Sequence, residues 1–389
     1  MTPRSNPVVP PATIGMLGGG QLGKYSLVAA NAMGYRTVVV DPDASAPARI
    51  VADDHLVAAY DDAATIERLA MDCSVVTTEF ENAPAHALGR LAAAVRVAPS
   101  AEAVAIAQNR IVEKAFLADH AVAVGPHVAA PADIGPDALE QARHLADSGA
   151  VVKTAQFGYD GKGQRRVGGR AELDAALAEF AGNDCIVEAL LELRAEVSVV
   201  VARTEQGTVE SWAVTENVHV DGILDVSVAP ARVADDLAAR ASGLATTIAD
   251  ELDYVGVLAV EMFVVGDDEL LVNEIAPRPH NSGHWTLDAS VTSQFEQQIR
   301  AVCGVGLGDT AMTAPAVAMV NLLGDLWFSA EVAEPVEPNW AVALAEPAAT
   351  LHLYGKTEPR RGRKMGHLTV TAATPDAAES AARTLRSQL

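Results

Sequence analysis

Apolar and polar residues follow one another in two different patterns along the chain. Between Ala12 and Pro99, short apolar runs such as ATIGML and RTVVV alternate with helical segments such as QLGKYSLVAANAMG. This order is typical of βαβ units and predicts a doubly wound parallel sheet of the α/β class. Beyond residue 120, many apolar runs come in pairs joined by turn residues, which indicates hairpins and an α+β region.

The changes of pattern divide the chain into parts. We expect a disordered, proline-rich tail over residues 1–11 and an α/β domain over residues 12–104. A central domain should span residues 105–310, with a subdomain at about 120–190 that carries a flexible flap. A small β-rich domain should complete the chain over residues 311–389. With 389 residues in all, each domain can bury a core of its own.

The central domain contains one hairpin with an unusual charge pattern. Alternating apolar residues lead to a turn at Gly266-Asp267-Asp268, and the pattern resumes as Leu270-Leu271-Val272. If the loop is centred between Asp267 and Asp268, Glu261 faces Glu274 across the ladder. Loops of two or four residues preserve this pair, whereas a loop of odd length would slip it.

Two opposed carboxylates on one face of a sheet repel each other at ~5 Å between Cβ atoms. Glu261 and Glu274 are therefore expected to hold a cation, with Asn273 assisting. An all-oxygen ligand set suits Mg²⁺ or Mn²⁺. Without metal, a neutral substitution at Glu274 should relieve the repulsion and preserve or raise stability. A solvated outer face is the alternative.

The segment after the hairpin, IAPRPHNSGHW, contains two prolines and cannot continue a central strand. It is expected to be a rigid loop. Arg278, His280, Asn281 and His284 would lie on this loop just beyond the metal site, where a small anion could bind. A polar surface loop is the alternative.

Two further segments lie at the carboxyl edge of the predicted parallel sheet. Gly18-x-Gly20-x-x-Gly23 with Asp41 matches a dinucleotide fingerprint, but an anion-binding turn or a plain strand-to-helix turn fits equally well. TTEFEN at residues 77–82 places two acids and an amide at the same edge. Capping of the next helix by Asn82 is the alternative for that segment.

A helix from Ala101 to Asp119 is predicted to lead into the flap region. There, the strand Ala150–Thr154 carries Lys153 and runs into GYDGKGQ at residues 158–164. Its glycine amides and its lysine could close over phosphates, although an ordinary hairpin loop is the alternative.

Two later strands offer weaker signals. Glu188 ends an apolar strand and could form a ledge for adenine and ribose. A strand pair from Val209 to Ala229 carries His219 near its turn, where a structural histidine is as plausible as a ligand.

The C-terminal part contains a basic cluster that stands out in an acidic chain. The formal net charge is -23, which argues against nucleic-acid and anionic-membrane partners. Between residues 356 and 364, however, five basic residues form a local anion trap: Lys356, Arg360, Arg361, Arg363 and Lys364.

The cysteines and the lack of a targeting segment indicate the cellular compartment. Cys73, Cys185 and Cys303 have no metal-ligand spacing and are expected to be buried free thiols in a reducing environment. The chain has no signal-peptide pattern and no apolar run of membrane-spanning length. We therefore expect a cytoplasmic protein.

An α/β lead domain, a glycine-rich flap after a lysine-bearing strand and an acidic hairpin together resemble the ATP-grasp superfamily. GGGQLG, TTEFEN, GYDGKGQ, NEIAPRPHNSGHWT and YGK followed by GRKMGH are similar to motifs of the 5-(carboxyamino)imidazole ribonucleotide synthases of purine biosynthesis. These motifs span nearly the whole chain, and APRPHNSGHWT is the most specific of them.

The resemblance implies a set of roles for individual residues. It assigns ATP binding to Arg110, Lys153, Gly158, Tyr159, Asp160, Gly161, Lys162, Gly163, Gln164, Glu188, Ala189, Leu190, Leu191, Glu196, His219, Asn273 and Glu274. It assigns the ribonucleotide to Gly20, Gln21, Glu81, Lys356, Arg363 and Lys364. It assigns catalysis to Tyr159, Asp160, Arg278, His280 and Asn281, and the metal to Glu261 and Glu274.

The implied reaction joins bicarbonate to the amine of 5-aminoimidazole ribonucleotide at the expense of ATP, through carboxyphosphate. A homodimer is also expected. The alternatives are another acyl-phosphate ligase or transformylase acting on a ribonucleotide amine, a nucleotide-binding regulatory module, or an NAD oxidoreductase.

Overall fold

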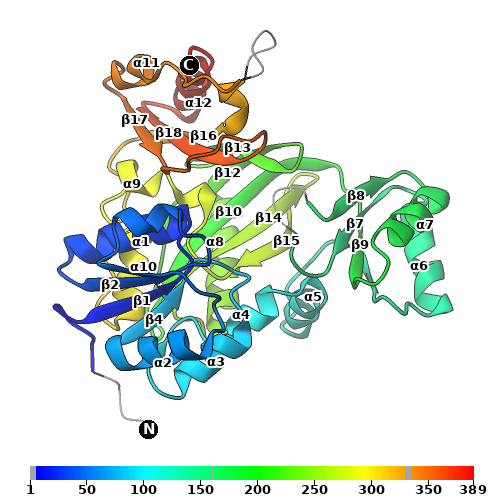
Figure 1. The fold of residues 1–389 in the computed structure, drawn as a ribbon. Helices are drawn as coiled ribbons and strands as arrows, with labels where there is room; N and C mark the ends of the chain where they lie inside the picture. Colours follow the sequence, from blue (N-terminus) through cyan, green and yellow to red (C-terminus); the bar gives the residue numbers. More distant parts are fainter. Residues whose placement is uncertain (1–5, 159–161, 329–333) are drawn as a thin grey trace.

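The structure is a computed structural model that describes residues 6–158, 162–328 and 334–389. Within these residues the strands form three sheets. One lies in the N-terminal domain, one in the flap subdomain, and one is shared by the central and C-terminal domains. Figure 1 shows the N-terminal sheet and its helices on one side of a central sheet, with the flap subdomain projecting on the other side.

The N-terminal sheet is parallel throughout and has the order β3-β2-β1-β4-β5. Its strands are β1 (Thr13–Leu17), β2 (Arg36–Val40), β3 (Asp54–Leu56), β4 (Val75–Thr78) and β5 (Arg96–Val97). Its helical segments are α1 (Gln21–Ala32), η1 (Pro47–Ile50), α2 (Ala63–Asp72) and α3 (Ala85–Ala92). The doubly wound α/β sheet is confirmed, and its Val- and Ile-rich strands are buried, as strands covered on both faces require.

The N-terminal tail is not disordered over the residues that the structure describes. The Val8 amide donates to the Cys303 carbonyl over 2.8 Å, and the Tyr35 hydroxyl donates to the Val8 carbonyl over 2.8 Å. For residues 6–11 the expectation of disorder is therefore wrong. Two backbone hydrogen-bonding groups of Val8 tie this segment to elements far away in the sequence.

The predicted helix from Ala101 to Asp119 is two helices, α4 (Ala101–Ala107) and α5 (Arg110–Asp119). Asn109 separates them, because its Oδ1 accepts hydrogen bonds from the amides of Ile111 at 2.9 Å and Val112 at 3.3 Å. Such an N-cap satisfies amides that a new helix leaves unpaired. The break places Arg110 in the first turn of α5.

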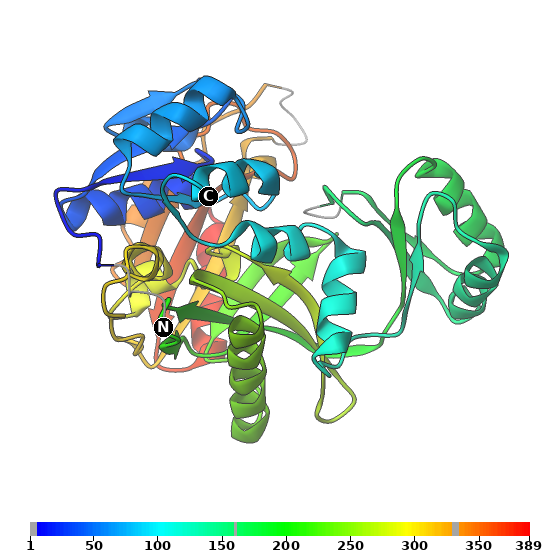
Figure 2. The ribbon, with the colours of Figure 1, turned by 90° about the horizontal axis from the view of Figure 1, so that it is seen from below.

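The flap subdomain contains an antiparallel sheet with the order β6-β9-β7-β8. Its elements are β6 (His127–Ala130), α6 (Pro136–Ala146), β7 (Ala150–Thr154), β8 (Gln164–Val167), α7 (Arg170–Glu179) and β9 (Cys185–Ala189). Figure 2 shows that this subdomain stands apart from the rest of the molecule, to which the two connecting chain segments join it.

The central sheet has the order β15-β14-β10-β12-β13-β16-β18-β17, with β11 paired to β10. Its strands are β10 (Leu193–Arg203), β11 (Val209–Ser211), β12 (Thr215–Val220), β13 (Ile223–Ala229), β14 (Gly256–Val265), β15 (Glu269–Ala276), β16 (Ala316–Leu323), β17 (Ala349–Leu353) and β18 (Lys364–Ala372). The C-terminal part is β-rich as expected, but its strands continue the central sheet through the β13–β16 pair.

The remaining helical segments cover this sheet or connect its strands. They are α8 (Asp235–Glu251), η2 (Asn281–Gly283), α9 (Thr286–Ala289), α10 (Gln294–Val302), η3 (Gly324–Trp327), α11 (Trp340–Leu344) and α12 (Pro375–Arg386).

The central hairpin pairs Glu261 with Glu274, but not for the reason expected from its loop. The loop Gly266–Asp268 has an odd length, and Val265 pairs with Glu269, one residue out of the register that an even loop would give. A β-bulge between Glu261 and Met262 then restores the register. The predicted pair is confirmed, whereas the even-length loop is wrong.

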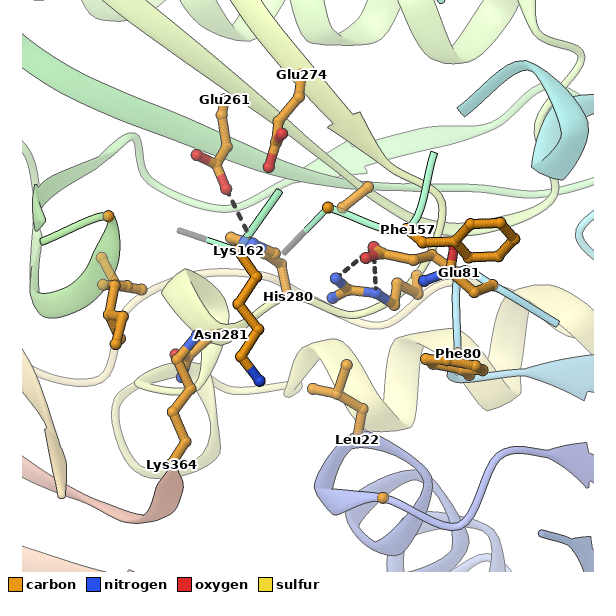
Figure 3. A pocket seen from close by; sticks show the side chains of 18 of the residues that line it. Leu22, Phe80, Glu81, Phe157, Lys162, Glu261, Glu274, His280, Asn281 and Lys364 are labelled. Carbon is orange, nitrogen blue, oxygen red and sulfur yellow. Dashed lines mark hydrogen bonds and ion pairs between the residues drawn. The ribbon is translucent and has the colours of Figure 1, made fainter. Parts of the chain in front are cut away.

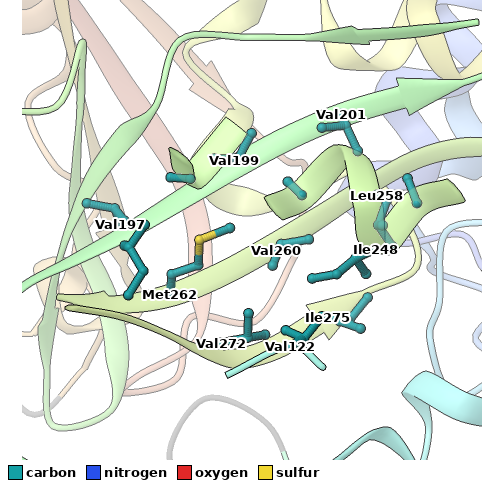
Figure 4. Close-up of a cluster of buried hydrophobic side chains, with 14 of the residues drawn as sticks. Val122, Val197, Val199, Val201, Ile248, Leu258, Val260, Met262, Val272 and Ile275 are labelled. Carbon is teal, nitrogen blue, oxygen red and sulfur yellow. The ribbon is translucent and has the colours of Figure 1, made fainter. Parts of the chain in front are cut away.

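A hydrophobic core lies between α8 and one face of the hairpin. Val260, Met262 and Val272 are fully or almost fully buried there and pack with Ile248 of α8 (Figure 4). Since side chains alternate along a strand, Glu261 points to the opposite face. The core thus fixes the strands and directs both carboxylates away from α8.

Candidate active site

A cavity of about 800 Å³ lies where the N-terminal sheet, the central hairpin and the C-terminal strands meet. All three regions and the edge of the flap line it. Among the residues proposed from the sequence, the lining includes Gly20, Gln21, Glu81, Arg110, Gly158, Lys162, His219, Glu261, Glu274, Arg278, His280, Asn281, Lys356, Arg363 and Lys364. The structure therefore brings together residues up to 344 positions apart, from Gly20 to Lys364.

The facing carboxylates each contact a different side chain. Arg110 Nη1 lies 2.7 Å from Glu274 Oε2, and His280 Nε2 lies 3.0 Å from Glu261 Oε1. Burial raises the pKa of Glu274, but Arg110 and Lys153 outweigh this effect and lower the pKa to about 2. Glu274 is therefore ionised at neutral pH. Figure 3 shows both carboxylates reaching from neighbouring strands toward the cavity, with His280 close to Glu261.

The carboxylate pair fits a hard divalent cation. The Glu261 side chain is 11% exposed and that of Glu274 33%, both supply oxygen atoms only, and they face one another from directly paired strand positions. Asn273, the neighbour of Glu274 in the chain, provides a further oxygen, although its Oδ1 lies 3.5 Å from Lys153 Nζ.

Lys153 belongs to a compact charged group beside the hairpin. Its Nζ lies 2.5 Å from Glu188 Oε2, and Lys114 Nζ lies 3.5 Å from Glu188 Oε1. Burial raises the pKa of Glu188, but Lys153 and Lys114 more than offset this and lower it. Two cations therefore lie beside one buried carboxylate, so these three side chains together carry a net positive charge next to the flap.

The sequence reasoning missed Glu113 and Lys114, which are almost completely buried. Lys114 Nζ donates to the Asn273 carbonyl over 2.7 Å, and Glu113 Oε1 accepts from the Ile275 amide over 2.5 Å. Burial raises the pKa of Glu113 to about 8. Their spacing could have revealed them, because positions three and four residues after Arg110 share its face of the helix.

The glycine-rich turn holds carboxylates of the chain itself. Glu79 accepts hydrogen bonds from the Gly20 amide at 2.7 Å and the Gly23 amide at 2.9 Å, at the start of α1. Asp41, the acid of the apparent dinucleotide fingerprint, accepts from the Gly19 amide at 2.7 Å. The helix N-terminus does attract an anion, as expected. Because that anion is Glu79, the dinucleotide interpretation is wrong.

Glu81 follows Glu79 but faces the cavity. Its Oε2 lies 2.5 Å from Arg278 Nη2 and 3.0 Å from Arg278 Nε. Asn82 also lines the cavity and does not cap α3, whose N-cap residue is Pro84. The TTEFEN segment thus contributes to the cavity, and the capping alternative is wrong.

The loop after the hairpin contains positions that line the cavity and positions that are internal. Asn281 lines the cavity, but its side-chain amide makes two hydrogen bonds with Asn321. Its Oδ1 accepts from Asn321 Nδ2 over 2.7 Å, and its Nδ2 donates to Asn321 Oδ1 over 3.1 Å. His284 is completely buried, and its ring packs against Phe295 at 5.5 Å between ring centres. The expectation that His284 lies at the anion site is therefore wrong, since aromatic packing takes it into the interior.

All five basic residues of the predicted anion trap line the cavity. Lys356 Nζ donates to the Lys364 carbonyl over 2.7 Å, and Arg363 Nη1 donates to the Glu358 carbonyl over 2.8 Å. These bonds are to neutral carbonyls, so the cationic charges are not cancelled by them. The segment thus gathers five cationic side chains at the cavity, one of which, Arg361, lies 3.6 Å from Asp325.

The remaining flap and ledge residues are only partly in the cavity. Gly158 and Lys162 line it, whereas Gly163 and Gln164 continue into β8. Tyr159, Asp160 and Gly161 lie outside the described residues.

The ledge residues lie beside the cavity. Ala189, Leu190 and Leu191 follow Glu188 at the end of β9 and do not line it. Glu196 Oε2 lies 2.8 Å from His219 Nδ1. Burial lowers the pKa of His219, but Glu196 and Glu261 outweigh it and raise the pKa. Glu188, Glu196 and Lys153 are not among the residues that line the cavity either.

Known families match all three parts of the chain. The ribonucleotide synthetase preATP-grasp domain matches residues 11–108, the ATP-grasp domain residues 115–295, and the phosphoribosylaminoimidazole carboxylase C-terminal domain residues 317–381. N5-carboxyaminoimidazole ribonucleotide synthase of Bacillus subtilis is 44% identical over 93% of this chain and 92% of its own length. The chain belongs to the N5-carboxyaminoimidazole ribonucleotide synthase family. It is therefore similar throughout to ATP-dependent ligases of the ATP-grasp type.

Further relatives and solved structures agree with this family. The synthase of Brucella melitensis is 43% identical over 92% of this chain and 96% of its own. An ADP complex of an N5-carboxyaminoimidazole ribonucleotide synthetase has a TM-score of 0.89 and 39% identity, covering 99% of this chain and 98% of that one. The synthase from Aspergillus clavatus in complex with ADP and 5-aminoimidazole ribonucleotide has a TM-score of 0.85 and 29% identity, covering 97% and 99%.

Proposed function

We propose that the protein uses ATP to join bicarbonate to the amine of 5-aminoimidazole ribonucleotide, as N5-carboxyaminoimidazole ribonucleotide synthases do. The observation that carries this proposal is the single cavity in which a buried carboxylate pair and a cationic segment face each other. The carboxylates suit a nucleotide-bound cation, and the basic segment suits a second phosphate. A ligase that joins a nucleotide-activated group to a phosphorylated amine needs both.

In this proposal bicarbonate is first phosphorylated, because it is a poor electrophile until one of its oxygens becomes part of a phosphoryl leaving group. The γ-phosphoryl group of ATP passes to bicarbonate and gives ADP and carboxyphosphate. The amine nitrogen then attacks the carboxyl carbon, phosphate leaves with the electron pair of the broken C–O bond, and the nitrogen loses a proton. The product is the carbamate of the ribonucleotide.

The ATP site is proposed between the flap and the hairpin. The ammonium groups of Lys153 and Lys114 would contact the phosphates. Arg110, which pairs with Glu274, would lie between this site and the metal site. The other proposed nucleotide contacts are Gly158–Gln164, Glu188–Leu191, Glu196, His219 and Asn273. Fixed cations in a partly closed site stabilise developing phosphoryl charge with little reorganisation.

Bicarbonate and the ribonucleotide are proposed to occupy the remainder of the cavity. Arg278 and His280 would hold bicarbonate, together with Asn281, Tyr159 and Asp160. Lys356, Arg363 and Lys364 would bind the ribonucleotide phosphate, with Gly20, Gln21 and Glu81 along the opposite wall. Support comes from the cationic segment, whose lysines and arginines converge on the cavity from one side.

We further propose that Glu261 and Glu274 hold Mg²⁺ or Mn²⁺. When bound, the ion would supply positive charge at the phosphate oxygens of the nucleotide.

The assembly and location are also proposals. A homodimer is favoured by exposed apolar side chains on neighbouring elements, Val28 on α1 and Ile50 on η1. A cytoplasmic location is favoured by three buried cysteines, all of them free thiols. Within the described residues, no helix is both long and apolar enough to span a membrane.

The function is tested by measuring ADP release with each substrate omitted in turn. We expect release to require ATP, Mg²⁺, bicarbonate and 5-aminoimidazole ribonucleotide together. Release that is independent of bicarbonate but dependent on formate would favour the transformylase alternative and overturn the proposal.

A further inference from the structure

A row of small polar side chains crosses the central sheet on the face that carries the two carboxylates. In the strand registers, Glu261 is opposite Ser198 on β10, and Asn217 on β12 is opposite Ser227 on β13. Because alternate residues of a strand share a face, these positions all point to the side away from α8. Ser198, Asn217 and Ser227 are at most 5% exposed.

These side chains are connected by hydrogen bonds. Ser227 Oγ lies 2.8 Å from Asn217 Oδ1, and Asn217 Nδ2 lies 2.9 Å from Ser198 Oγ. Ser198 Oγ lies 2.8 Å from Ser282 Oγ on the loop above the sheet. Ser282 Oγ in turn lies 2.9 Å from His280 Nδ1, and His280 Nε2 lies 3.0 Å from Glu261.

The direction of this chain is fixed at His280. The Glu261 carboxylate only accepts, so Nε2 of His280 must carry a proton. The backbone amide of Ser282 only donates, and it lies 3.3 Å from Nδ1, so that nitrogen must be the acceptor. In this arrangement Nε2 of His280 donates and Nδ1 accepts.

The remaining bonds follow from that arrangement, since each hydroxyl has one proton to donate. The Ser282 hydroxyl donates to His280 Nδ1 and accepts from Ser198. The Ser198 hydroxyl then accepts from the Asn217 amide, whose Oδ1 accepts from Ser227. Every link has one donor and one acceptor, and every link agrees with the next.

We propose that Ser282, Ser198 and Asn217 are positioning residues that keep Nδ1 of His280 as an acceptor and direct its Nε2–H toward Glu261 at the edge of the cavity. The consequence for substrate rests on the proposed function: when a cation engages Glu261, this N–H suits an oxygen of bicarbonate or carboxyphosphate. The opposite tautomer would present a lone pair to the anion and repel it. This chain of hydrogen bonds thus favours a proton on the ring nitrogen nearest the substrate.

The tautomer itself can be observed without substrate. In protein with ¹⁵N-labelled histidine, the ring nitrogens of His280 are identified among the ten histidines by their loss in His280→Gln. We expect the wild-type signals to show a protonated Nε2 and a bare Nδ1. In Asn217→Asp, the carboxylate can only accept, so Ser198 must donate to it and Ser282 must donate to Ser198. Ser282 Oγ then no longer donates to Nδ1 of His280, and the ¹⁵N signal of Nδ1 should shift, while Nε2 keeps the proton that it donates to Glu261.

Steady-state kinetics supply the second measurement. Ser198→Ala breaks the chain two links from the ring and should raise the KM for bicarbonate about 3- to 10-fold, the effect of one lost neutral hydrogen bond. The KM for ATP should not change, and Ser198→Thr, which retains a hydroxyl, should restore the bicarbonate KM. Ser26→Ala is the matched control, because Ser26 is a completely buried serine of α1 outside this chain.

The outcomes separate this inference from the proposed function. An Nδ1 signal of His280 that is the same in wild type, Asn217→Asp and Ser198→Ala would overturn the positioning role, as would a bicarbonate KM unchanged by Ser198→Ala. Loss of activity in Ser198→Ala that Ser198→Thr does not rescue would also count against it. If wild type shows no bicarbonate-dependent turnover, the proposed function fails, while the ¹⁵N signals still decide whether the chain acts on His280.

Discussion

Arg278 and Glu81 form a bidentate contact between the loop after the central hairpin and the edge of the N-terminal sheet. Two nitrogens of Arg278 lie 2.5 and 3.0 Å from the same Glu81 oxygen, and both side chains line the cavity. We assign Arg278 to bicarbonate and Glu81 to the ribonucleotide. With these proposed roles, one ion pair would couple the positions of two substrates that different parts of the chain bind.

Arg278→Ala should abolish bicarbonate-dependent ADP release while ATP binding survives, because the lost guanidinium lies apart from the lysines assigned to ATP. The substitution also leaves Glu81 without its cation, which should lower stability by about 1–3 kcal/mol. Turnover assays and ATP titration calorimetry measure the two functions separately. In the double variant Arg278→Ala with Glu81→Gln, stability should recover but turnover should not. Normal bicarbonate-dependent turnover in the single variant would show that Arg278 is structural only.

Lys356→Ala and Arg363→Ala should raise the KM for the ribonucleotide with little change in the KM for ATP. Each removes a charge-assisted contact to phosphate, worth about 1.5–3 kcal/mol, or roughly 10- to 150-fold in KM. Arg240→Ala is a suitable control, since Arg240 is an exposed cation of α8 that pairs with Asp268. An equal rise in both KM values would contradict the assignment of this segment to the ribonucleotide.

Glu113 should make the protein less stable as the pH rises. Burial raises its pKa to about 8 in the folded protein, whereas an unfolded glutamate titrates near its ordinary value of about 4.3. Between these two values the folded state holds a proton that the unfolded state has lost. The free energy of unfolding should therefore fall with rising pH, by at most about 1.4 kcal/mol per pH unit, until Glu113 ionises in the folded state.

Urea unfolding at pH 6 and pH 8 tests this dependence. Glu113→Gln keeps an acceptor for the Ile275 amide but cannot ionise, so its stability should differ less between the two pH values than that of wild type. Glu67→Gln, at an exposed position of α2, should behave as wild type does. The same pH dependence in Glu113→Gln and wild type would mean that other groups cause it.

Local patterns predicted those elements that local chemistry determines. The βαβ order and the strand Ala150–Thr154 follow from apolar periodicity, and the structure contains both of them. The basic segment was also predictable, because its residues lie close together in the sequence and line one cavity. The sequence was sufficient to predict a feature where residues that are neighbours in sequence are also neighbours in space.

Features that depend on distant contacts could not be read from local patterns. Glu79 was predicted at the sheet edge, but only the fold shows that it binds the Gly20 and Gly23 amides, 59 and 56 positions away. Lys114 looks like an ordinary helix lysine until Glu188 and the Asn273 carbonyl are placed beside it. The bulge next to Glu261 has no turn residue to signal it. In each case tertiary contacts decide the role.

Glu274→Gln should remove most of the turnover and also lower stability. The first effect follows if the carboxylate holds the nucleotide's cation, since that ion carries transition-state charge. The second follows from Arg110, whose guanidinium lies 2.7 Å from Glu274 and would lose its charged partner. The sequence alone suggested the opposite effect on stability, because it showed the repulsion from Glu261 but not the arginine that offsets it.

Glu261→Gln provides the matched comparison, because its partner is His280, and an amide oxygen can still accept a hydrogen bond from Nε2 of that ring. We expect both variants to lose turnover and the stabilisation that Mg²⁺ with ADP gives to wild type. In metal-free buffer, however, urea unfolding should show a larger loss for Glu274→Gln, by about 1–3 kcal/mol for the hydrogen bond to a charged group. Normal turnover of either variant at saturating Mg²⁺ would mean that the facing glutamates are a structural pair. Equal stability of the two variants without metal would mean that the ion pair between Arg110 and Glu274 adds nothing to the fold.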